Sequence, residues 1–177
     1  MQSDQELMLA YRAGDRAAFD ELFARYRDPV WRFFRRRVAD TARAEELAQE
    51  TFLALIQSAP RYEPRAAFRS YVFGVAYNVL LAARRRRRRG IEEPIAELDP
   101  PGASSDPASV LWIRQAMAAL DPGEREVLML REYEALSYDE IASLTGVPVG
   151  TVRSRLFRAR EALRAKLAGR EAQEVPR

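Results

Sequence analysis

Apolar and polar residues recur with the period of an α-helix along most of the chain, and the pattern is clearest over residues 137–168. Ser137 followed three residues later by Glu140 is a capping-box pattern, which predicts the start of a helix. Gly146 can end that helix in the left-handed conformation, and Pro148 suits the first turn of a second helix. Two helices joined by so short a turn predict a helix-turn-helix, whose second helix enters the DNA major groove.

The second of these helices, expected over residues 149–168, has one apolar face and one basic face. Its apolar stripe consists of Val152, Leu156, Ala159 and Leu163. The opposite side carries Arg153, Ser154, Phe157 and Arg158. An exposed Phe157 can contact a thymine methyl group, or it can pack on an adjoining helix. A solvated surface explains any single arginine, whereas the whole set predicts contact with DNA.

Four helices are expected before residue 90, because apolar residues keep the helical period there. Their expected spans are 4–11, 15–38, 41–57 and about 66–87. Asp4 and Asp15 can cap the first two helices, while Asp28-Pro29 either kinks or restarts the second. The second helix is expected to hold Phe19, Leu22, Phe23 and Tyr26 on one face. The fourth is expected to bury most of its aromatic residues, Phe68, Phe73 and Tyr77.

Residues 90–108 break this period and are rich in Pro, Gly, Ser and acidic residues, a composition typical of a flexible linker. After it, helices are expected near 108–119 and from Asp121-Pro122 to Glu132. No strand pattern and no internal repeat occurs, so we expect an all-α fold of two small helical domains. The predicted organisation is a domain over 1–89, this linker, a domain over 109–170 and a tail over 171–177.

The 177 residues include no Cys and no His. This composition excludes disulfides and thiolate metal sites, and it removes the commonest metal ligand and the commonest general base near neutral pH. We therefore expect no enzyme activity, no metal site and no cofactor. No apolar run approaches the roughly 18 residues of a membrane span, and the polar first residues are unlike a signal peptide. We expect a cytoplasmic protein without membrane insertion, monomeric when free.

The net charge of +3 hides a marked segregation of charge. Residues 91–110 carry five acidic residues and no base, whereas basic residues prevail before them and include a run of arginines over 84–89. Two basic lobes around an acidic connector suggest a chain that grips DNA twice. The arginine run follows an aromatic helix. Single-stranded DNA binds such surfaces, because bases stack on rings while arginines follow the phosphates. A solvated helix end is the alternative.

The third expected helix carries a polar patch opposite its apolar face. The patch consists of Glu46, Gln49 and Glu50, with Leu53 beside them. The other side carries Leu47, Ala48, Thr51, Phe52 and Leu55, which are expected in the core. An acidic and amide surface flanked by an exposed Leu is suited to a protein partner, and solvation alone explains it equally well.

Three segments of the chain resemble the sigma factors of bacterial RNA polymerase, in the extracytoplasmic-function (ECF) group. Residues 44–52, AEELAQETF, resemble the core-polymerase-binding helix of sigma domain 2. Residues 68–78, FRSYVFGVAYN, resemble the helix that melts and reads the −10 element. The segments LSYDEIA over 136–142 and GVPVGTVRSRL over 146–156 closely resemble the −35-reading helix-turn-helix of sigma domain 4. In order and spacing the resemblance covers roughly residues 7–168.

The resemblance implies a non-catalytic transcription initiation factor that joins the nucleoid in the holoenzyme. Its implied partners are core RNA polymerase (β′ clamp helices and β flap), promoter DNA and an anti-sigma factor. Core polymerase would be bound by Glu46, Gln49 and Glu50. The −10 element would be bound by Tyr62, Arg65, Arg69, Asn78, Arg84 and Arg85. The −35 element would be bound by Thr151, Arg153, Ser154, Arg155, Phe157, Arg158 and Arg160, with Arg155 and Arg160 on phosphates.

The chain departs from the pattern of the family at three positions. Arg43 stands where the family often has Asp, Tyr71 where it usually has Trp, and Ala135 where it usually has Gly. Two other classes fit part of the chain. A stand-alone helix-turn-helix regulator needs only residues 110–168, and a protein that coats nucleic acid needs only the basic surfaces. Preference for a forked duplex with a single-stranded −10 segment would separate a sigma factor from the first class.

Overall fold

The computed structural model describes residues 2–89 and 107–174, and every regular element within them is a helix. The all-α fold predicted from the sequence is confirmed. The helices form two compact units, which are treated separately below. The linker predicted over 90–108 lies outside the described residues as far as residue 106, and the tail predicted over 171–177 lies outside them from residue 175. Residues 107 and 108 begin a helix and residues 171–174 end one, so the predicted linker and tail are wrong at these positions.

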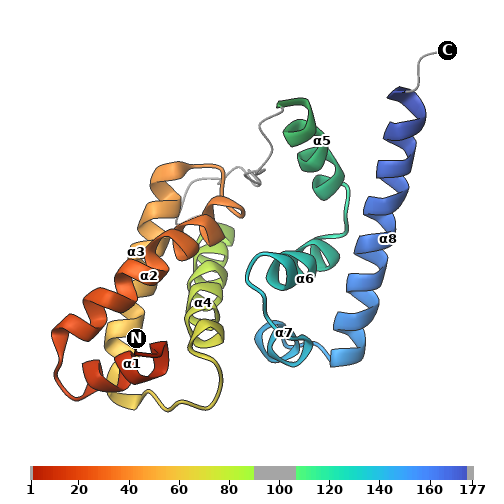
Figure 1. Ribbon diagram of the computed structural model, residues 1–177. Coiled ribbons are helices and arrows are strands. Elements are labelled where there is room, and N and C mark those ends of the chain that lie inside the picture. Colours follow the sequence, from red (N-terminus) through yellow and green to blue (C-terminus); the bar gives the residue numbers. More distant parts are fainter. Residues whose placement is uncertain (1, 90–106, 175–177) are drawn as a thin grey trace. The chain divides into compact units, whose positions relative to one another are not determined.

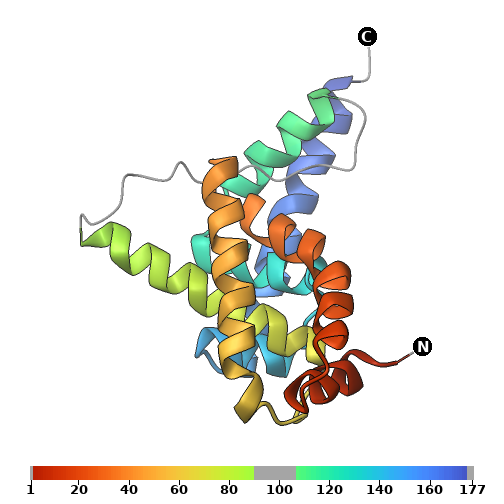
Figure 2. The same ribbon diagram turned by 90° about the vertical axis from the view of Figure 1, so that its left-hand side faces the viewer.

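Within residues 2–89, the N-terminal unit has four α-helices and one 3₁₀ turn (Figure 1). They are α1 (Asp4–Arg12), α2 (Arg16–Arg35), α3 (Thr41–Ser58), the turn η1 (Ala59–Arg61) and α4 (Phe68–Arg88). α2 packs between α1 and α3, and α3 packs on α4 (Figure 2). The chain therefore folds back and forth around one core, and its helices match the predicted spans to within three residues.

The start of α1 differs from the sequence prediction. Ser3, not Asp4, is the cap: its hydroxyl accepts the Glu6 N–H at 3.3 Å, and the Glu6 carboxylate accepts the Ser3 N–H at 2.7 Å. Asp4 serves packing instead, because the hydroxyl of Tyr26 on α2 donates to its carboxylate at 2.6 Å. This hydrogen bond joins the first two helices.

α2 runs through Pro29 without a restart, although Pro cannot donate the helical hydrogen bond. Buried side chains before and after the proline, Tyr26 and Val30, anchor both halves of the helix in the same core. Burial and the hydrogen bond to Asp4 raise the pKa of the Tyr26 hydroxyl. Tertiary packing therefore overrides the local signal for a break.

The core of the N-terminal unit is aromatic. Phe33, Phe34 and Phe73 are each at most 1% exposed. The ring centroid of Phe33 lies 5.0 Å from that of Phe34 and 5.7 Å from that of Phe73. Phe68 and Tyr77 are buried as well, so the prediction that these aromatic residues of the fourth helix form core is confirmed.

The shared aromatic face predicted for α2 is wrong for Phe23. Leu22 and Tyr26 are buried, whereas Phe23 is 42% exposed. Phe23 follows Leu22 directly and so points about 100° away from it around the helix. Its ring packs edge to face with that of Phe52 on α3, with the centroids 4.7 Å apart. This places an apolar side chain at the outer seam between α2 and α3.

Within residues 107–174, the C-terminal unit has four helices (Figure 1). They are α5 (Pro107–Ala118), α6 (Pro122–Glu132), α7 (Tyr138–Thr145) and α8 (Val149–Glu174). Asp121 caps α6, as predicted, because its carboxylate accepts the Gly123 N–H at 2.8 Å. α5, α6 and α7 all pack against α8. The core side chains that are at most 1% exposed include Val127, Leu130, Ile141, Val152, Leu156 and Ala159.

Candidate nucleic-acid interface

The turn between α7 and α8 is fixed by local hydrogen bonds. The hydroxyl of Ser137 accepts the Glu140 N–H at 3.2 Å, and the Glu140 carboxylate accepts the Ser137 N–H at 2.7 Å, so the predicted capping box is confirmed. Gly146 ends α7 with φ at 71°, a left-handed value that favours glycine. The carbonyl of Pro148 accepts the Thr151 N–H at 2.8 Å, which opens α8. The two helices thus form the predicted helix-turn-helix.

One side of α8 faces the core and the other faces solvent. Val152, Leu156 and Ala159 are at most 1% exposed. The solvent side presents Arg153, Ser154, Phe157 and Arg158, all of them exposed. Phe157 is 66% exposed, so it does not pack on an adjoining helix within the described residues. An aromatic ring held in water among arginines is suited to base edges in a DNA groove.

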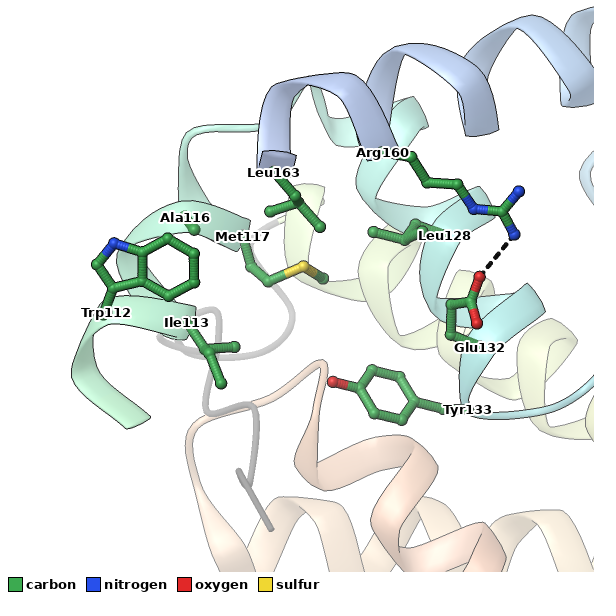
Figure 3. A pocket seen from close by; sticks show the side chains of 9 residues that line it. All are labelled: Trp112, Ile113, Ala116, Met117, Leu128, Glu132, Tyr133, Arg160 and Leu163. Carbon is green, nitrogen blue, oxygen red and sulfur yellow. Dashed lines mark hydrogen bonds and ion pairs between the residues drawn. The ribbon is translucent and has the colours of Figure 1, made fainter. Parts of the chain in front are cut away.

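Arg155 and Arg160 are half-buried on the two borders of this solvent side. The guanidinium of Arg155 lies against Gly123 of α6, where a Cβ atom would come within 3.0 Å of its Cζ atom. On the other border, the Nη2 of Arg160 donates to the Glu132 carboxylate at 2.7 Å (Figure 3). This hydrogen bond raises the pKa of Arg160. Both arginines are therefore held against α6.

Arg158 is exposed and also has a partner on α6. Its Nε donates to the Glu124 carboxylate at 2.6 Å. The side chain of Glu124 is only 15% exposed, compared with 56% for Arg158. The sequence contains no signal for this pair, because the two residues stand 34 positions apart. α6 therefore contacts Arg158 on the solvent side of α8, as well as Arg155 and Arg160 on the two borders of that side.

A pocket of about 290 Å³, which the sequence did not predict, opens between α5, α6 and α8 (Figure 3). Apolar side chains supply most of its wall, and the Glu132–Arg160 pair lies at its edge. The lining residues are Trp112, Ile113, Ala116, Met117, Leu128, Glu132, Tyr133, Arg160 and Leu163. Side chains from α8 meet those of the earlier helices α5 and α6 to build this surface, so helical periodicity alone does not reveal it.

In the N-terminal unit, α3 exposes most of the predicted polar patch. Glu46 and Gln49 are exposed, and Leu53 beside them is 57% exposed. Glu50 is half-buried, since Arg86 of α4 donates from Nη2 to both of its carboxylate oxygens, at 3.2 and 3.3 Å. One member of the arginine run over 84–89 thus stabilises the unit through an ion pair with the patch.

The patch continues into an apolar border. Ile56, further along α3, is 38% exposed, and Phe23 of α2 is 42% exposed. Arg43 closes the other end, where its Nη1 donates to the Glu46 carboxylate at 2.8 Å. We call Glu46, Gln49, Glu50 and Leu53 together the α3 patch. It combines two carboxylates and an amide with exposed apolar area, a combination suited to a protein partner.

Tyr62 lies between η1 and α4 and is only 3% exposed. Its ring centroid lies 4.9 Å from that of Tyr71 and 5.8 Å from that of Phe68. The Tyr62 hydroxyl has no hydrogen-bond partner among the residues that the structure describes, and burial raises its pKa. This side chain is therefore packed in the unit, not open at the surface.

The other residues predicted for the −10 element lie at different depths. Asn78 and Arg85 are exposed, and they share the outward face of α4 because they stand two turns apart. Arg65 is exposed between η1 and α4, where its Nε donates to Glu63 at 2.9 Å. Arg69 is half-buried, with its guanidinium 4.9 Å from the ring centroid of Phe73. Arg84 is half-buried and borders a small hollow with Arg37 and Arg87.

The segment that carries Tyr62 is attached to α1 by two hydrogen bonds. The Nη1 of Arg12 donates to the Tyr62 carbonyl at 2.8 Å. The Nε2 of Gln5 donates to the Ala66 carbonyl at 2.8 Å. Sequence reasoning missed these contacts, because they join residues 50 and 61 positions apart. α1 therefore positions a segment that has little regular structure of its own.

Within residues 2–89 and 107–174, no three His, Cys, Asp or Glu side chains are placed to hold a metal ion. No helix in the same residues is both long and apolar enough to cross a membrane.

Comparison with known proteins finds a family match in each unit. Residues 22–90 match the model of Sigma-70 region 2, and residues 111–163 match the model of Sigma-70, region 4. RNA polymerase sigma factor CarQ of Myxococcus xanthus is 35% identical, over 96% of this chain and 100% of its own. The ECF RNA polymerase sigma factor SigC of Mycobacterium tuberculosis is 32% identical, over 90% of this chain and 88% of its own.

Two solved structures share the fold. CnrH, in complex with the cytosolic domain of CnrY, matches with a TM-score of 0.67 and 24% identity, over 95% of this chain and 99% of its own. The sigma factor RpoE from Bartonella quintana, in complex with the anti-sigma factor NepR, matches with a TM-score of 0.70 and 21% identity. That alignment covers 85% of this chain and 96% of RpoE.

Proposed function

Because this chain belongs to the extracytoplasmic-function sigma factors of bacterial RNA polymerase, we propose that it reads a −35 element with α8 and a melted −10 strand with its N-terminal unit. Sigma factors are non-catalytic subunits that give core RNA polymerase its promoter specificity, and this chain is such a transcription initiation factor. The observation that carries the proposal is the open basic face of α8, where Phe157 and Arg158 stand exposed above a buried apolar seam.

The solvent side of α8 is suited to direct reading of base pairs. An Arg can make a bidentate contact with guanine, and an aromatic ring can contact the methyl group of thymine. We assign base contacts to Arg153, Ser154, Phe157 and Arg158. We assign DNA contacts that hold α8 in register to Thr151, in its first turn, and to Arg155 and Arg160, at the borders of its solvent side. The two arginines are assigned to phosphates.

The N-terminal unit is assigned to the −10 strand after the duplex has opened. Asn78 and Arg85 are accessible on α4, and Arg65 is accessible beside it. Arg69 and Arg84 are assigned to the same strand. Tyr62 supplies a buried hydroxyl without a partner in the described residues, which a base could satisfy on entering the site. Capture of an unstacked base shifts the duplex toward the open form, because stacking and hydrogen bonds offset the cost of unpairing.

The α3 patch is assigned to the β′ clamp helices of core polymerase. Glu46 and Gln49 are exposed, and Leu53 adds apolar area beside them. Arg86 holds Glu50 in place from α4. Protein interfaces combine apolar area with polar groups, and aromatic residues are enriched in them. Phe23 and Ile56 beside the patch add such exposed apolar area.

We assign the β flap to the C-terminal unit, where the pocket between α5, α6 and α8 offers an apolar surface for a helix or loop of a partner. Control by an anti-sigma factor is proposed as well. Two proteins that share the fold were solved as complexes: RpoE with the anti-sigma factor NepR, and CnrH with the cytosolic domain of CnrY. An inhibitor that covers the α3 patch or the face of α8 would block the assigned contacts.

The experiment that tests this function is promoter-specific transcription, reconstituted in vitro from purified components. The purified full chain is mixed with core RNA polymerase and a genomic fragment library, and transcript starts are mapped by sequencing. Discrete starts that share paired upstream motifs are the expected result. Absence of starts, together with failure to co-elute with core polymerase, would contradict the proposal and favour a stand-alone DNA-binding regulator.

Two variants of the α3 patch and one control sharpen the result. Gln49→Lys adds a positive charge without breaking an ion pair, and Glu50→Lys also breaks the pair with Arg86. Both variants are expected to weaken co-elution with core polymerase by roughly tenfold or more, because like charges at an interface are costly. Asp28→Lys makes the same charge change as Glu50→Lys on α2, outside the patch, and should bind normally. Normal binding by Gln49→Lys would overturn the assignment of the patch.

A further inference from the structure

The N-terminus of α6 approaches the reading face of α8 closely enough to control it. Glu124 stands in the first turn of α6, and its carboxylate accepts the Nε of Arg158 at 2.6 Å. One residue earlier, Gly123 leaves room for the guanidinium of Arg155. The first turn of α6 therefore holds two of the arginines that we assign to DNA, one through an ion pair and one through close packing.

We propose that Glu124 is a positioning residue for base recognition: by holding the Nε of Arg158, it aims that guanidinium at one base pair of the −35 element. This inference rests on the proposed function, in which α8 reads DNA. A guanidinium carries five N–H donors in a rigid fork. The contact with Glu124 uses only the Nε donor, and the two terminal nitrogens, which can pair with guanine O6 and N7, remain available.

Glu124 is itself held firmly. Its backbone N–H donates to the Asp121 carboxylate at 3.3 Å, as part of the cap of α6. Its side chain is 15% exposed, and a carboxylate in the first turn of a helix is favoured by the helix dipole. A fixed carboxylate restricts the rotamers of the long Arg158 side chain before DNA arrives, so less conformational freedom is lost on binding.

The charge of Glu124 adds to specificity in a second way. Phosphates attract any free Arg and repel a nearby carboxylate, so the Arg158–Glu124 pair contributes less to sequence-independent binding than a free Arg would. The pair still offers its donors to a matching base. The carboxylate thereby lowers the affinity for wrong sequences more than the affinity for the right one, which raises the ratio between them.

The test compares full-chain variants bound to core RNA polymerase. The probe is a duplex library in which each −35 position of one mapped promoter is varied in turn. Arg158→Ala should lose roughly tenfold or more of the preference at one position. Glu124→Gln should lose roughly threefold to tenfold at that same position, because a charge-assisted hydrogen bond becomes a weaker neutral one, while binding to a scrambled duplex stays equal or rises. In the double variant, Glu124→Gln should add nothing to Arg158→Ala.

Glu161→Gln is the matched control. It removes the same charge from α8 and weakens a similar ion pair, with Arg164, and neither residue is assigned to a base, a phosphate or polymerase. It should leave the base preference intact. If Glu124→Gln keeps the base preference while Arg158→Ala reduces it, the inference about Glu124 is overturned and the proposed function of α8 stands. If Arg158→Ala changes no position, the base-reading role of α8 fails, and the inference fails with it. Thermal melting of each variant checks that it remains folded.

Discussion

The two units present their candidate DNA contacts in different ways. In the C-terminal unit, Phe157 and Arg158 are exposed on the solvent side of one helix. In the N-terminal unit, Tyr62 is 3% exposed and packs against Tyr71 and Phe68. Only Asn78, Arg65 and Arg85 are open to a strand among the residues assigned to the −10 element.

This difference corresponds to the two forms of DNA that we assign to the units. A duplex groove is a rigid surface, so a preformed helix face can read it without rearrangement. A flipped base needs a pocket, which must open or be completed as the base enters. In the N-terminal unit, Tyr62 lies in a short segment outside the long helices, which hydrogen bonds from Arg12 and Gln5 attach to α1. Such a segment can rearrange more easily than a packed helix.

The largest expected effect is the loss of stability of one unit while the other stays folded. Leu156 is 1% exposed in the core beneath the reading face. Leu156→Ala should lower the free energy of unfolding of the C-terminal unit by about 2–5 kcal/mol, because truncation leaves a cavity. Amide signals in NMR spectra of the full chain should then be lost or broadened for residues of α6 to α8 and kept for α1 to α4. Equal loss in both units would contradict the division into two separately stable parts.

Much of this division was predictable from the sequence. The capping box at Ser137 and Glu140, the glycine at 146 and the apolar stripe of α8 are local patterns, and the structure confirms them. What the sequence did not reveal depends on contacts between distant elements. The Arg158–Glu124 pair and the pocket between α5, α6 and α8 are of this kind.

The errors have the same origin. Ser3 and Asp4 are both able to cap a helix, and the choice is decided by Tyr26 on another helix, which engages Asp4. Phe23 fits an apolar face in projection, but its contact with Phe52 of α3 leaves it 42% exposed. The resemblance assigned Tyr62 to DNA without showing its depth, because burial of a residue outside the long helices depends on which neighbours cover it.

A smaller effect tests the attachment of the Tyr62 segment. Arg12→Ala removes the hydrogen bond to the Tyr62 carbonyl and should lower the free energy of unfolding of the N-terminal unit by about 1 kcal/mol. Amide hydrogen exchange should quicken over residues 59–67, and the yield of open promoter complexes should fall. Duplex binding at the −35 element should stay unchanged. Arg16→Ala, an exposed Arg at the start of α2, is the matched control, and an equal loss of open complexes there would remove the special role of Arg12.

The smallest effect concerns the backbone at one joint in each unit. Ala135 has φ at 56° just before the capping box of α7, whereas in the N-terminal unit the joint between α1 and α2 uses Gly14, with φ at 109°. A left-handed alanine costs roughly 1–2 kcal/mol, and glycine avoids that cost but loses more chain entropy on folding. Ala135→Gly should therefore raise the free energy of unfolding of the C-terminal unit by about 0.5–1 kcal/mol in thermal denaturation.

Gly14→Ala should act in the opposite direction on the N-terminal unit, although no atom lies within 4 Å of the added Cβ. A lowered stability in Ala135→Gly would show that Ala135 is held by its side chain, and that the joint of the C-terminal unit carries no backbone strain.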